Sequence, residues 1–241
     1  MNKIWIIAQR ELKTFFDSLI AYVILALFLG LTGYFTWYSG DNVFAIGQAT
    51  LMPLFKCAYW TLFLLIPALT MKMFAGENQS GTIELLLTKA VTDWQVILGK
   101  FMAVLILLVA ALLLTLPYYI SISYLGDGVD HGVVITGYLG LFLMCAAYAA
   151  IGIWTSSSTN NVILAFFSSL IIGVFFHLLF SLLSAQLSGS LSRLLYNMSV
   201  STHINSIVRG VVDSKDLIFF ISITFGALLL TEGTLAKRHK A

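Results

Sequence analysis

Long apolar runs separated by short polar segments dominate the chain from residue 18 onward. A helix that crosses the hydrocarbon core of a bilayer needs about 20 mostly apolar residues, and six stretches fit that description. We therefore expect residues 18–241 to form an all-α integral membrane domain with six transmembrane helices. The predicted spans cover residues 18–38, 51–74, 101–125, 132–154, 161–187 and 217–231.

Residues 1–17 show a different pattern, in which one helical face is apolar and the other polar. Such a helix lies in the plane of the membrane interface, with Trp at headgroup depth and Lys or Arg toward water. We expect an amphipathic elbow helix that turns into the first span, although a simple topology anchor would show the same pattern. Its characteristic residues are Trp5, Arg10, Glu11 and Lys13.

Residues 75–95, between the second and third spans, are too polar to cross a bilayer. They nevertheless contain an apolar cluster at positions 83 and 85–87, which predicts a short helix over residues 82–88. Thr92 and Gln95 have the spacing of a capping box, in which each side chain bonds the backbone N–H of the other residue. We expect this box to open the helix of the third span.

Basic residues divide unequally between the two sides of the predicted bundle. Cytoplasmic segments collect Lys and Arg near the ends of spans. With the N-terminus inside, the inner side holds Lys3, Arg10, Lys13, Lys72, Lys89, Lys100, Lys237, Arg238 and Lys240, and the outer side holds Lys56, Arg193, Arg209 and Lys215. This asymmetry predicts that both termini are cytoplasmic.

The connections between spans differ in length. The segment 188–215 is the longest on the outer side and contains apolar positions such as Leu194 and Ile204, which predict short helices at or dipping into the outer leaflet. The inner segment 155–160 is uncharged and predicts a small turn. No connection is long enough for a soluble domain, which has at least about 50 residues. We expect any energising domain to come from another chain.

Composition narrows the functional classes further. Hydrophobic residues make up 59% of the chain and charged residues 10%, whereas a soluble chain has about 25% charged residues. The net charge of +2 is too small to suggest nucleic-acid binding. Cys57 and Cys145 lie in apolar runs without C-x-x-C spacing, so neither a zinc site nor a redox pair is expected.

Few residues in the spans suggest chemistry. His177 lies within the fifth span, where an ionisable residue suggests a transport pathway, while a neutral histidine bonded to a neighbouring helix is the alternative. The chain has no H-E-x-x-H or G-x-S-x-G motif, which disfavours a membrane enzyme. The residues from Gly76 to Thr82 resemble a phosphate-binding loop only superficially, because its lysine and preceding strand are missing.

Residues 77–86 read Glu-Asn-Gln-Ser-Gly-Thr-Ile-Glu-Leu-Leu. This stretch resembles the E-x(3)-G-T-x-E-x-L-L signature of ABC-2-type permeases. Residues 9–12, 98–101 and 203–213 fit the same family in order and spacing, so the resemblance covers nearly the whole chain. Within the family the chain looks closest to the gliding-motility permease of Bacteroidota, GldF, because of its length, the near absence of a soluble outer domain and the stretch at residues 201–210.

The resemblance implies a permease subunit in the bacterial inner membrane, with a coupling helix that docks on a separate ABC ATP-binding subunit. That partner would bind ATP and Mg²⁺, and this chain would bind no cofactor. A second permease half is also implied, either a copy of this chain or another membrane subunit with a large outer domain. The implied coupling residues are Glu77, Gly81, Thr82, Glu84, Leu85 and Leu86, and the implied outer-side residues are His203, Arg209, Gly210 and Asp213.

A second function stays open from the sequence. The chain could be a membrane scaffold that anchors a larger gliding or secretion machine without transport of its own. Loss of the partner's ATPase activity would abolish the function of a transporter and leave that of a scaffold intact.

Overall fold

The computed structural model describes residues 3–40, 42–81, 92–126 and 128–238, and this part of the chain contains helices and no strand. Six helical segments are long and apolar enough to cross a membrane, which confirms the predicted all-α, six-span fold. They are Leu19–Trp37, Met52–Ser80, Asp93–Leu125, His131–Ser157, Val162–Gln186 and Ser214–Lys237.

Several spans are built from more than one helix. A turn after Thr70 divides the second span, Leu114 and Thr115 interrupt the third, and a π-helical turn lies within the fifth. The helices are α1 (Lys3–Asp17), α2 (Leu19–Trp37), α3 (Val43–Ile46), α4 (Met52–Thr70), α5 (Ala75–Ser80), α7 (Asp93–Leu113), α8 (Leu116–Leu125), α9 (His131–Ser157), α10 (Val162–Val174), η1 (Phe175–Leu179), α11 (Phe180–Gln186), α12 (Ser190–Asn197), α13 (Val200–Val208) and α14 (Ser214–Arg238).

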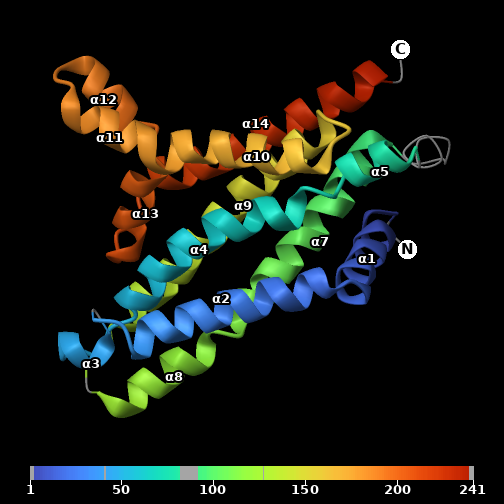
Figure 1. The fold of residues 1–241 in the computed structure, drawn as a ribbon. Helices are drawn as coiled ribbons and strands as arrows, with labels where there is room; N and C mark the ends of the chain where they lie inside the picture. The colour runs from blue at the N-terminus through green and yellow to red at the C-terminus, as the bar shows by residue number, and fades with distance from the viewer. Residues whose placement is uncertain (1–2, 41, 82–91, 127, 239–241) are drawn as a thin grey trace.

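The spans run side by side along one long axis (Figure 1). Helices α1 and α5, together with the end of α14, lie at one end of the bundle, which we call the elbow end. Helices α3, α11, α12 and α13 lie at the opposite end, the far end. The first and last helices therefore meet the same end of the bundle, as an even number of spans requires.

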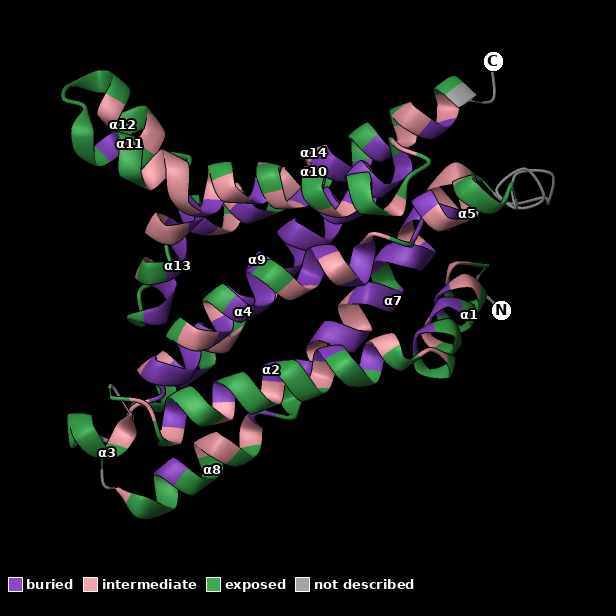
Figure 2. Ribbon diagram, in the orientation of Figure 1, coloured by how far each residue is buried: buried purple, intermediate pink, exposed green. Residues whose placement is uncertain are grey.

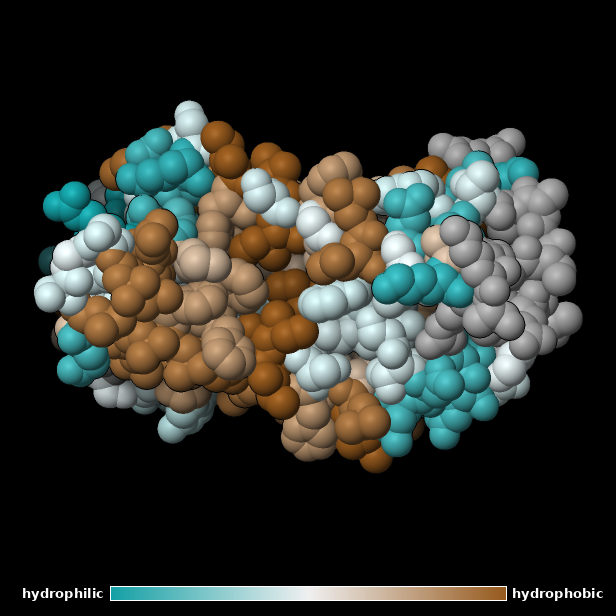
Figure 3. All heavy atoms as spheres, turned by 90° about the horizontal axis from the view of Figure 1, so that it is seen from above, coloured by the Kyte–Doolittle hydropathy of each residue, from teal (hydrophilic) through white to brown (hydrophobic). Residues whose placement is uncertain are grey.

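Helix α9 forms the centre of the bundle and packs against α4, α7, α10, α13 and α14. Its buried face carries many small residues, including Ala146 and Ala150, which allow neighbouring helices to approach closely. Helices α2, α10 and α14 expose many apolar side chains (Figure 2). Seen from above, the most hydrophilic residues gather at the two ends of the molecule and largely apolar residues lie between them (Figure 3). This distribution suits a bundle surrounded by lipid.

Two connections differ from the sequence prediction. The third span begins at Asp93 rather than residue 101, and the predicted capping box of Thr92 and Gln95 is present. The predicted inner turn 155–160 is wrong for its first half, because α9 continues to Ser157. The hydroxyl groups of Thr155 and Ser157 bond carbonyls of their own helix, so these polar residues extend the helix instead of ending it.

Candidate functional site

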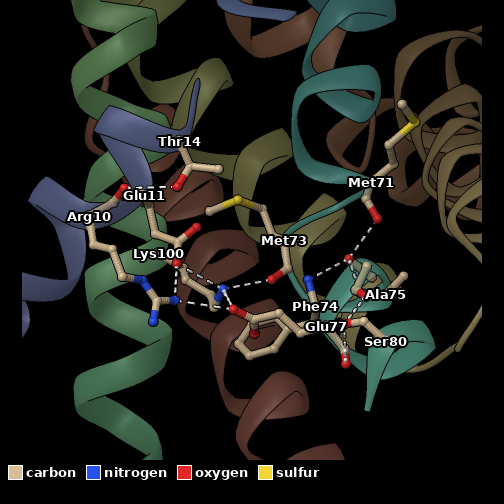
Figure 4. A network of polar contacts seen from close by, with 12 residues as sticks. Arg10, Glu11, Thr14, Met71, Met73, Phe74, Ala75, Glu77, Ser80 and Lys100 are labelled. Carbon is tan, nitrogen blue, oxygen red and sulfur yellow. Dashed lines mark hydrogen bonds and ion pairs between the residues drawn. The ribbon is translucent and has the colours of Figure 1, made fainter. Parts of the chain in front are cut away.

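Four charged side chains from three helices meet at the elbow end (Figure 4). Arg10 and Glu11 come from α1, Glu77 from α5 and Lys100 from α7. We call this group the elbow cluster. Arg10 and Glu11 were predicted in an elbow helix and Glu77 in a coupling segment, and the structure brings these residues together around Lys100.

Lys100 lies at the centre of the elbow cluster, and its side chain is 0% exposed. Its Nζ atom donates to Oε1 of Glu77 at 2.9 Å, to Oε1 of Glu11 at 3.2 Å and to the carbonyl oxygen of Met73 at 2.7 Å. An ammonium group has three N–H donors, so each has an acceptor. The ring of Phe74 adds a cation–π contact at 5.0 Å.

Arg10 closes the cluster from its exposed side. Its guanidinium donates to Oε1 of Glu11 at 2.6 Å and to Oε1 of Glu77 at 3.2 Å. The cluster therefore holds two positive and two negative groups and is electrically neutral. Buried charges are tolerated in a protein interior only when they are paired and hydrogen-bonded in this way.

The electrostatics of Glu11 follow from this geometry. Burial on its own would raise the pKa of the Glu11 carboxyl, but the positive charges of Lys100 and Arg10 outweigh burial and hold that pKa below its ordinary value. Glu11 therefore stays ionised beneath α1. It lies seven residues after Ile4 and four before Phe15, so the helical period already places it on the face that packs inward.

Close packing of α1 on α7 depends on Gly99, the residue before Lys100. A Cβ atom at position 99 would lie 2.7 Å from the side chain of Ile7 and 3.1 Å from the carbonyl oxygen of Ile4. Only glycine lets the backbone of α7 approach α1 this closely. Gly99 thus lets α1 pack closely on α7, and Lys100 holds α1 there through its ion pair with Glu11.

Helix α5 is also held on its other side. The hydroxyl of Ser156, on α9, accepts from the backbone N–H groups of Phe74 and Ala75, both at 3.0 Å, and donates to the carbonyl of Met71 at 2.9 Å. These N–H groups belong to the start of α5, where no carbonyl of the helix itself can accept them. Asn78 adds a bond from Nδ2 to the carbonyl of Thr159 at 2.9 Å.

The predicted coupling residues are only partly described by the structure. Glu77 belongs to the elbow cluster, and Gly81 ends α5 in the left-handed conformation with φ of 70°, which glycine adopts without strain. Thr82, Glu84, Leu85 and Leu86 lie outside the described residues. The predicted helix over residues 82–88 therefore stays a prediction.

The remaining elbow residues face outward. Trp5 is 45% exposed and Lys13 is exposed, while the residues of α1 that pack inward are Ile4, Ile7, Ala8, Glu11, Leu12 and Phe15. Trp5 was predicted to lie at headgroup depth, and the structure leaves it partly exposed beside the inward-packing face. An exposed tryptophan next to a membrane span suits the headgroup region of a bilayer.

His177 lies in the π-helical turn η1, at the junction of α4, α9 and α10. Its ring stacks on the rings of Tyr59 and Phe63, with centroids 3.9 and 4.3 Å apart, and its Nδ1 lies 3.0 Å from the hydroxyl of Tyr148. Its Nε2 is buried and has no hydrogen-bond partner in the described part of the chain. These contacts are those of a histidine that joins helices, and a role in a transport pathway stays a prediction.

His203 is buried at the far end and joins three helices. Its Nε2 donates to the carbonyl of Asn197 at 2.8 Å, since a carbonyl can only accept. Its Nδ1 lies 2.6 Å from Oδ1 of Asp216, which is almost completely buried in the first turn of α14. Sequence reasoning missed Asp216, because an acidic residue in a first helical turn is common for electrostatic reasons alone.

The other far-end residues singled out in the sequence are exposed. Arg209 ends α13, Gly210 follows it, and Asp213 pairs with Lys215 at 3.1 Å. The structure does not bring them together with His203 into one polar centre. No group of three or more His, Cys, Asp or Glu side chains within the described residues could hold a metal ion.

Lys100 and Ser156 are the main residues of the elbow end that sequence reasoning did not identify as central. Lys100 carried a signal, because it is a lone charge next to a long apolar run, and such charges are usually paired inside the protein. Lys100 was predicted only as one of the positive charges on the inner side. Ser156 carried no signal, since it lies in a run of hydroxyl residues that predicts a turn.

Comparison with known proteins bears on this fold and site. The model of the family described as ABC-2 family transporter protein matches residues 5–224. The chain is also 30% identical over 139 residues to the probable ABC transporter permease protein NosY of Stutzerimonas stutzeri. That alignment covers 56% of the chain, which spans about half (50%) of the relative's length. Since the family match covers most of the chain and the six-span fold agrees with it, the chain belongs to the ABC-2 family of transporter permeases.

Proposed function

We propose that the chain is the membrane-spanning half of an ATP-driven transporter whose separate ATP-binding subunit docks at the elbow end. The subunit would contact residues 75–95 and would itself bind ATP and Mg²⁺. The elbow cluster is the observation that carries this proposal. It fixes the helix that leads into this segment to two other helices of the bundle.

A force applied to the residues after α5 reaches the membrane only if α5 is rigidly attached. Glu77 attaches it to α7 through Lys100 and to α1 through Arg10. Ser156 and Asn78 attach the same short helix to the α9 side of the bundle. Helix α5 is thus bonded to the elbow helix, the third span and the central span. A displacement of α5 would act on all three, which is the property a coupling element needs.

The other features of the proposal rest on family membership and resemblance. A second permease half would pair with this chain, and the apolar residues exposed on α2, α10 and α14 provide the surface for lipid and for that partner. The distribution of basic residues supports cytoplasmic termini, and the family resemblance supports placement in the bacterial inner membrane. A role in gliding motility is supported by the resemblance of residues 201–210 to that subfamily.

Purification from native membranes tests the proposal. The tagged chain would be solubilised gently, and mass spectrometry would identify proteins recovered in near-stoichiometric amount. We expect an ATP-binding subunit in the wild-type sample and its loss from a Gly81→Pro, Glu77→Lys double variant that still inserts and folds. A Lys56→Gln variant at the far end serves as the matched control and should retain the subunit.

Recovery of no ATPase, even after mild crosslinking, would contradict the transporter function. The chain would then fit a scaffold, whose partners need no docking at the elbow end. Disruption of the gene by a transposon or by deletion separates a role in gliding motility from transport unrelated to it. Loss of a permease unrelated to motility would leave the spreading of cells unchanged.

A further inference from the structure

An open cavity of about 810 Å³ lies at the far end between α11, α12 and α13. All of its lining residues are polar except Ala185 and Val211. Two of them, Arg193 and Arg209, are positively charged, and none of the described residues that line the cavity is an Asp or Glu. The walls therefore favour a ligand that is negatively charged and rich in hydrogen-bonding groups.

The two arginines are not used for folding contacts. Neither guanidinium makes an ion pair or a hydrogen bond within the described part of the chain. Lys215, a neighbouring cation of the same end, differs in this respect because it pairs with Asp213 at 3.1 Å. A planar guanidinium presents paired N–H donors that match the oxygens of a phosphate group.

Neutral polar groups surround the two charges. The side chains of Tyr196, Thr202 and Asn205 line the cavity without a hydrogen bond to the described residues. Other hydroxyls of the wall are already satisfied, since Ser192 donates to the carbonyl of Ser184 at 2.8 Å and so holds α12 against α11. The cavity thus combines fixed walls with free donors and acceptors suited to ligand hydroxyl groups.

The position of α12 indicates where such a ligand would come from. Leu191, Leu194 and Met198 lie at spacings of three and four residues and are 55%, 61% and 43% exposed. The opposite face of the helix carries Arg193 and Tyr196 toward the cavity. An exposed apolar stripe at the end of the spans suits the boundary between headgroups and acyl chains, which would place the cavity beside lipid headgroups.

We propose that this cavity binds the headgroup of an anionic, hydroxyl-bearing phospholipid, with Arg193 and Arg209 on the phosphate and Tyr196, Thr202 and Asn205 around the headgroup hydroxyls. Arg209 also borders a second cavity that contains Asp130, and the two residues form no ion pair in the described structure. Arg193 is therefore the more specific probe of the site. The proposal does not depend on ATP coupling at the elbow end.

The test is lipid retention by the delipidated full chain, measured by native mass spectrometry after addition of phosphatidylglycerol or phosphatidylcholine. We expect selective retention of phosphatidylglycerol by the wild type. Arg193→Gln should weaken retention about tenfold, which corresponds to about 1.4 kcal/mol, and Arg193→Gln with Arg209→Gln should abolish the selectivity. Lys215→Gln removes a far-end cation outside the cavity and should retain the wild-type selectivity.

Three outcomes would overturn the proposal. Equal retention of the two lipids by the wild type would show that the cavity does not recognise an anionic headgroup. Undiminished selectivity in the double arginine variant would place the lipid elsewhere on the protein. Full displacement of the lipid by millimolar inorganic phosphate or glycerol 3-phosphate would show a site for soluble phosphates instead. Circular dichroism and gel filtration of each variant confirm that it is folded.

Discussion

Lys100 and Glu77 form an ion pair of 2.9 Å between the third span and the helix that ends the second span, in a place where the lysine has no contact with solvent. Glu11 shares the same ammonium group at 3.2 Å. A charge buried in this way gives geometric specificity more than stability, because its desolvation offsets most of the attraction. The geometry of the elbow cluster therefore depends on all four of its side chains.

Removing Lys100, the central cation of the elbow cluster, should strongly reduce the stability of the protein. Lys100→Met leaves Glu11 and Glu77 facing each other with Arg10 as their remaining partner in the cluster. Loss of one partner of a buried pair costs about 3–5 kcal/mol. We expect a clear drop in the thermal unfolding temperature of the purified protein, measured by tryptophan fluorescence.

Two further variants give this experiment its controls. Adding Glu11→Gln and Glu77→Gln to Lys100→Met removes the two carboxylates left facing each other and should recover part of the lost stability. Lys56→Met removes an exposed lysine at the far end, and surface changes of this type stay within about 0.5 kcal/mol. A Lys100→Met protein as stable as the Lys56→Met protein would disprove a structural role for the cluster.

The lowered pKa of Glu11 predicts how the stabilisation by the elbow cluster changes with pH. The ordinary pKa of this carboxyl is 4.5 and the folded value lies below it, so the unfolded chain takes up a proton more readily than the folded one. The stabilisation is therefore complete above about pH 4.5 and is lost as pH falls through the lower folded pKa. Unfolding temperatures measured between pH 7 and pH 3 should fall more steeply for the wild type than for Glu11→Gln.

Parallel curves for those two proteins would show that Glu11 has the same pKa folded and unfolded. The comparison with Glu11→Gln is needed because other carboxylates also titrate in this range. Only the difference between the two curves belongs to Glu11.

Packing of the elbow helix gives a prediction about Gly99. The Cβ atom of Gly99→Ala would lie 2.7 Å from the side chain of Ile7, so α1 must move away from α7. Overpacking of this type costs about 1–3 kcal/mol. We expect a lower thermal unfolding temperature, and Ile7→Ala added to Gly99→Ala should restore part of the lost stability.

Gly226→Ala is the matched control for that substitution. Gly226 also lies inside a spanning helix, but a Cβ atom there would have nothing within 4 Å. Replacing a helical glycine by alanine stabilises a helix by up to about 1 kcal/mol when space allows. Equal effects of the two substitutions would mean that α1 is not packed on Gly99.

The hydroxyl of Ser156 provides a prediction for the other side of α5. Ser156→Ala leaves the N–H groups of Phe74 and Ala75 without their acceptor in a buried place. An unsatisfied buried donor costs about 1–3 kcal/mol. We expect faster proteolysis near α5 and lower thermal stability, whereas Ser158→Ala, which removes an exposed hydroxyl bonded to its own helix, should be nearly neutral.

The fold of this chain can largely be predicted from hydropathy. A segment that crosses lipid must be a long apolar helix, because its backbone N–H and C=O groups can form hydrogen bonds only within the helix. The ends of spans are less readable, since polar residues that bond within a helix extend it. Ser157 shows this, because its hydroxyl bonds the carbonyl of Trp154 and the hydroxyl of Thr234 at 2.9 Å, so the predicted turn is helix instead.

The elbow cluster was predictable only in its parts. Arg10, Glu11 and Glu77 were singled out because they resemble family motifs. Helical periodicity places Glu11 on the apolar face of α1, seven residues after Ile4, but nothing in it places Lys100 between two carboxylates. Such partners are far apart in sequence, and Glu11 and Lys100 are separated by two spans. Their meeting is set by packing around Gly99 and Ser156, which a pattern of apolar and polar positions does not encode.

Site-specific photocrosslinking tests most directly the claim that the elbow end receives an ATP-binding subunit. A photoreactive amino acid replaces Gln79, an exposed residue of α5, or Gln48, an exposed residue of the far end, in the full chain in native membranes. The account predicts that the probe at position 79 captures a protein with ATP-binding motifs, identified by mass spectrometry, and that the probe at position 48 does not. Capture of that protein from position 48, or of no ATPase from position 79, would contradict the account.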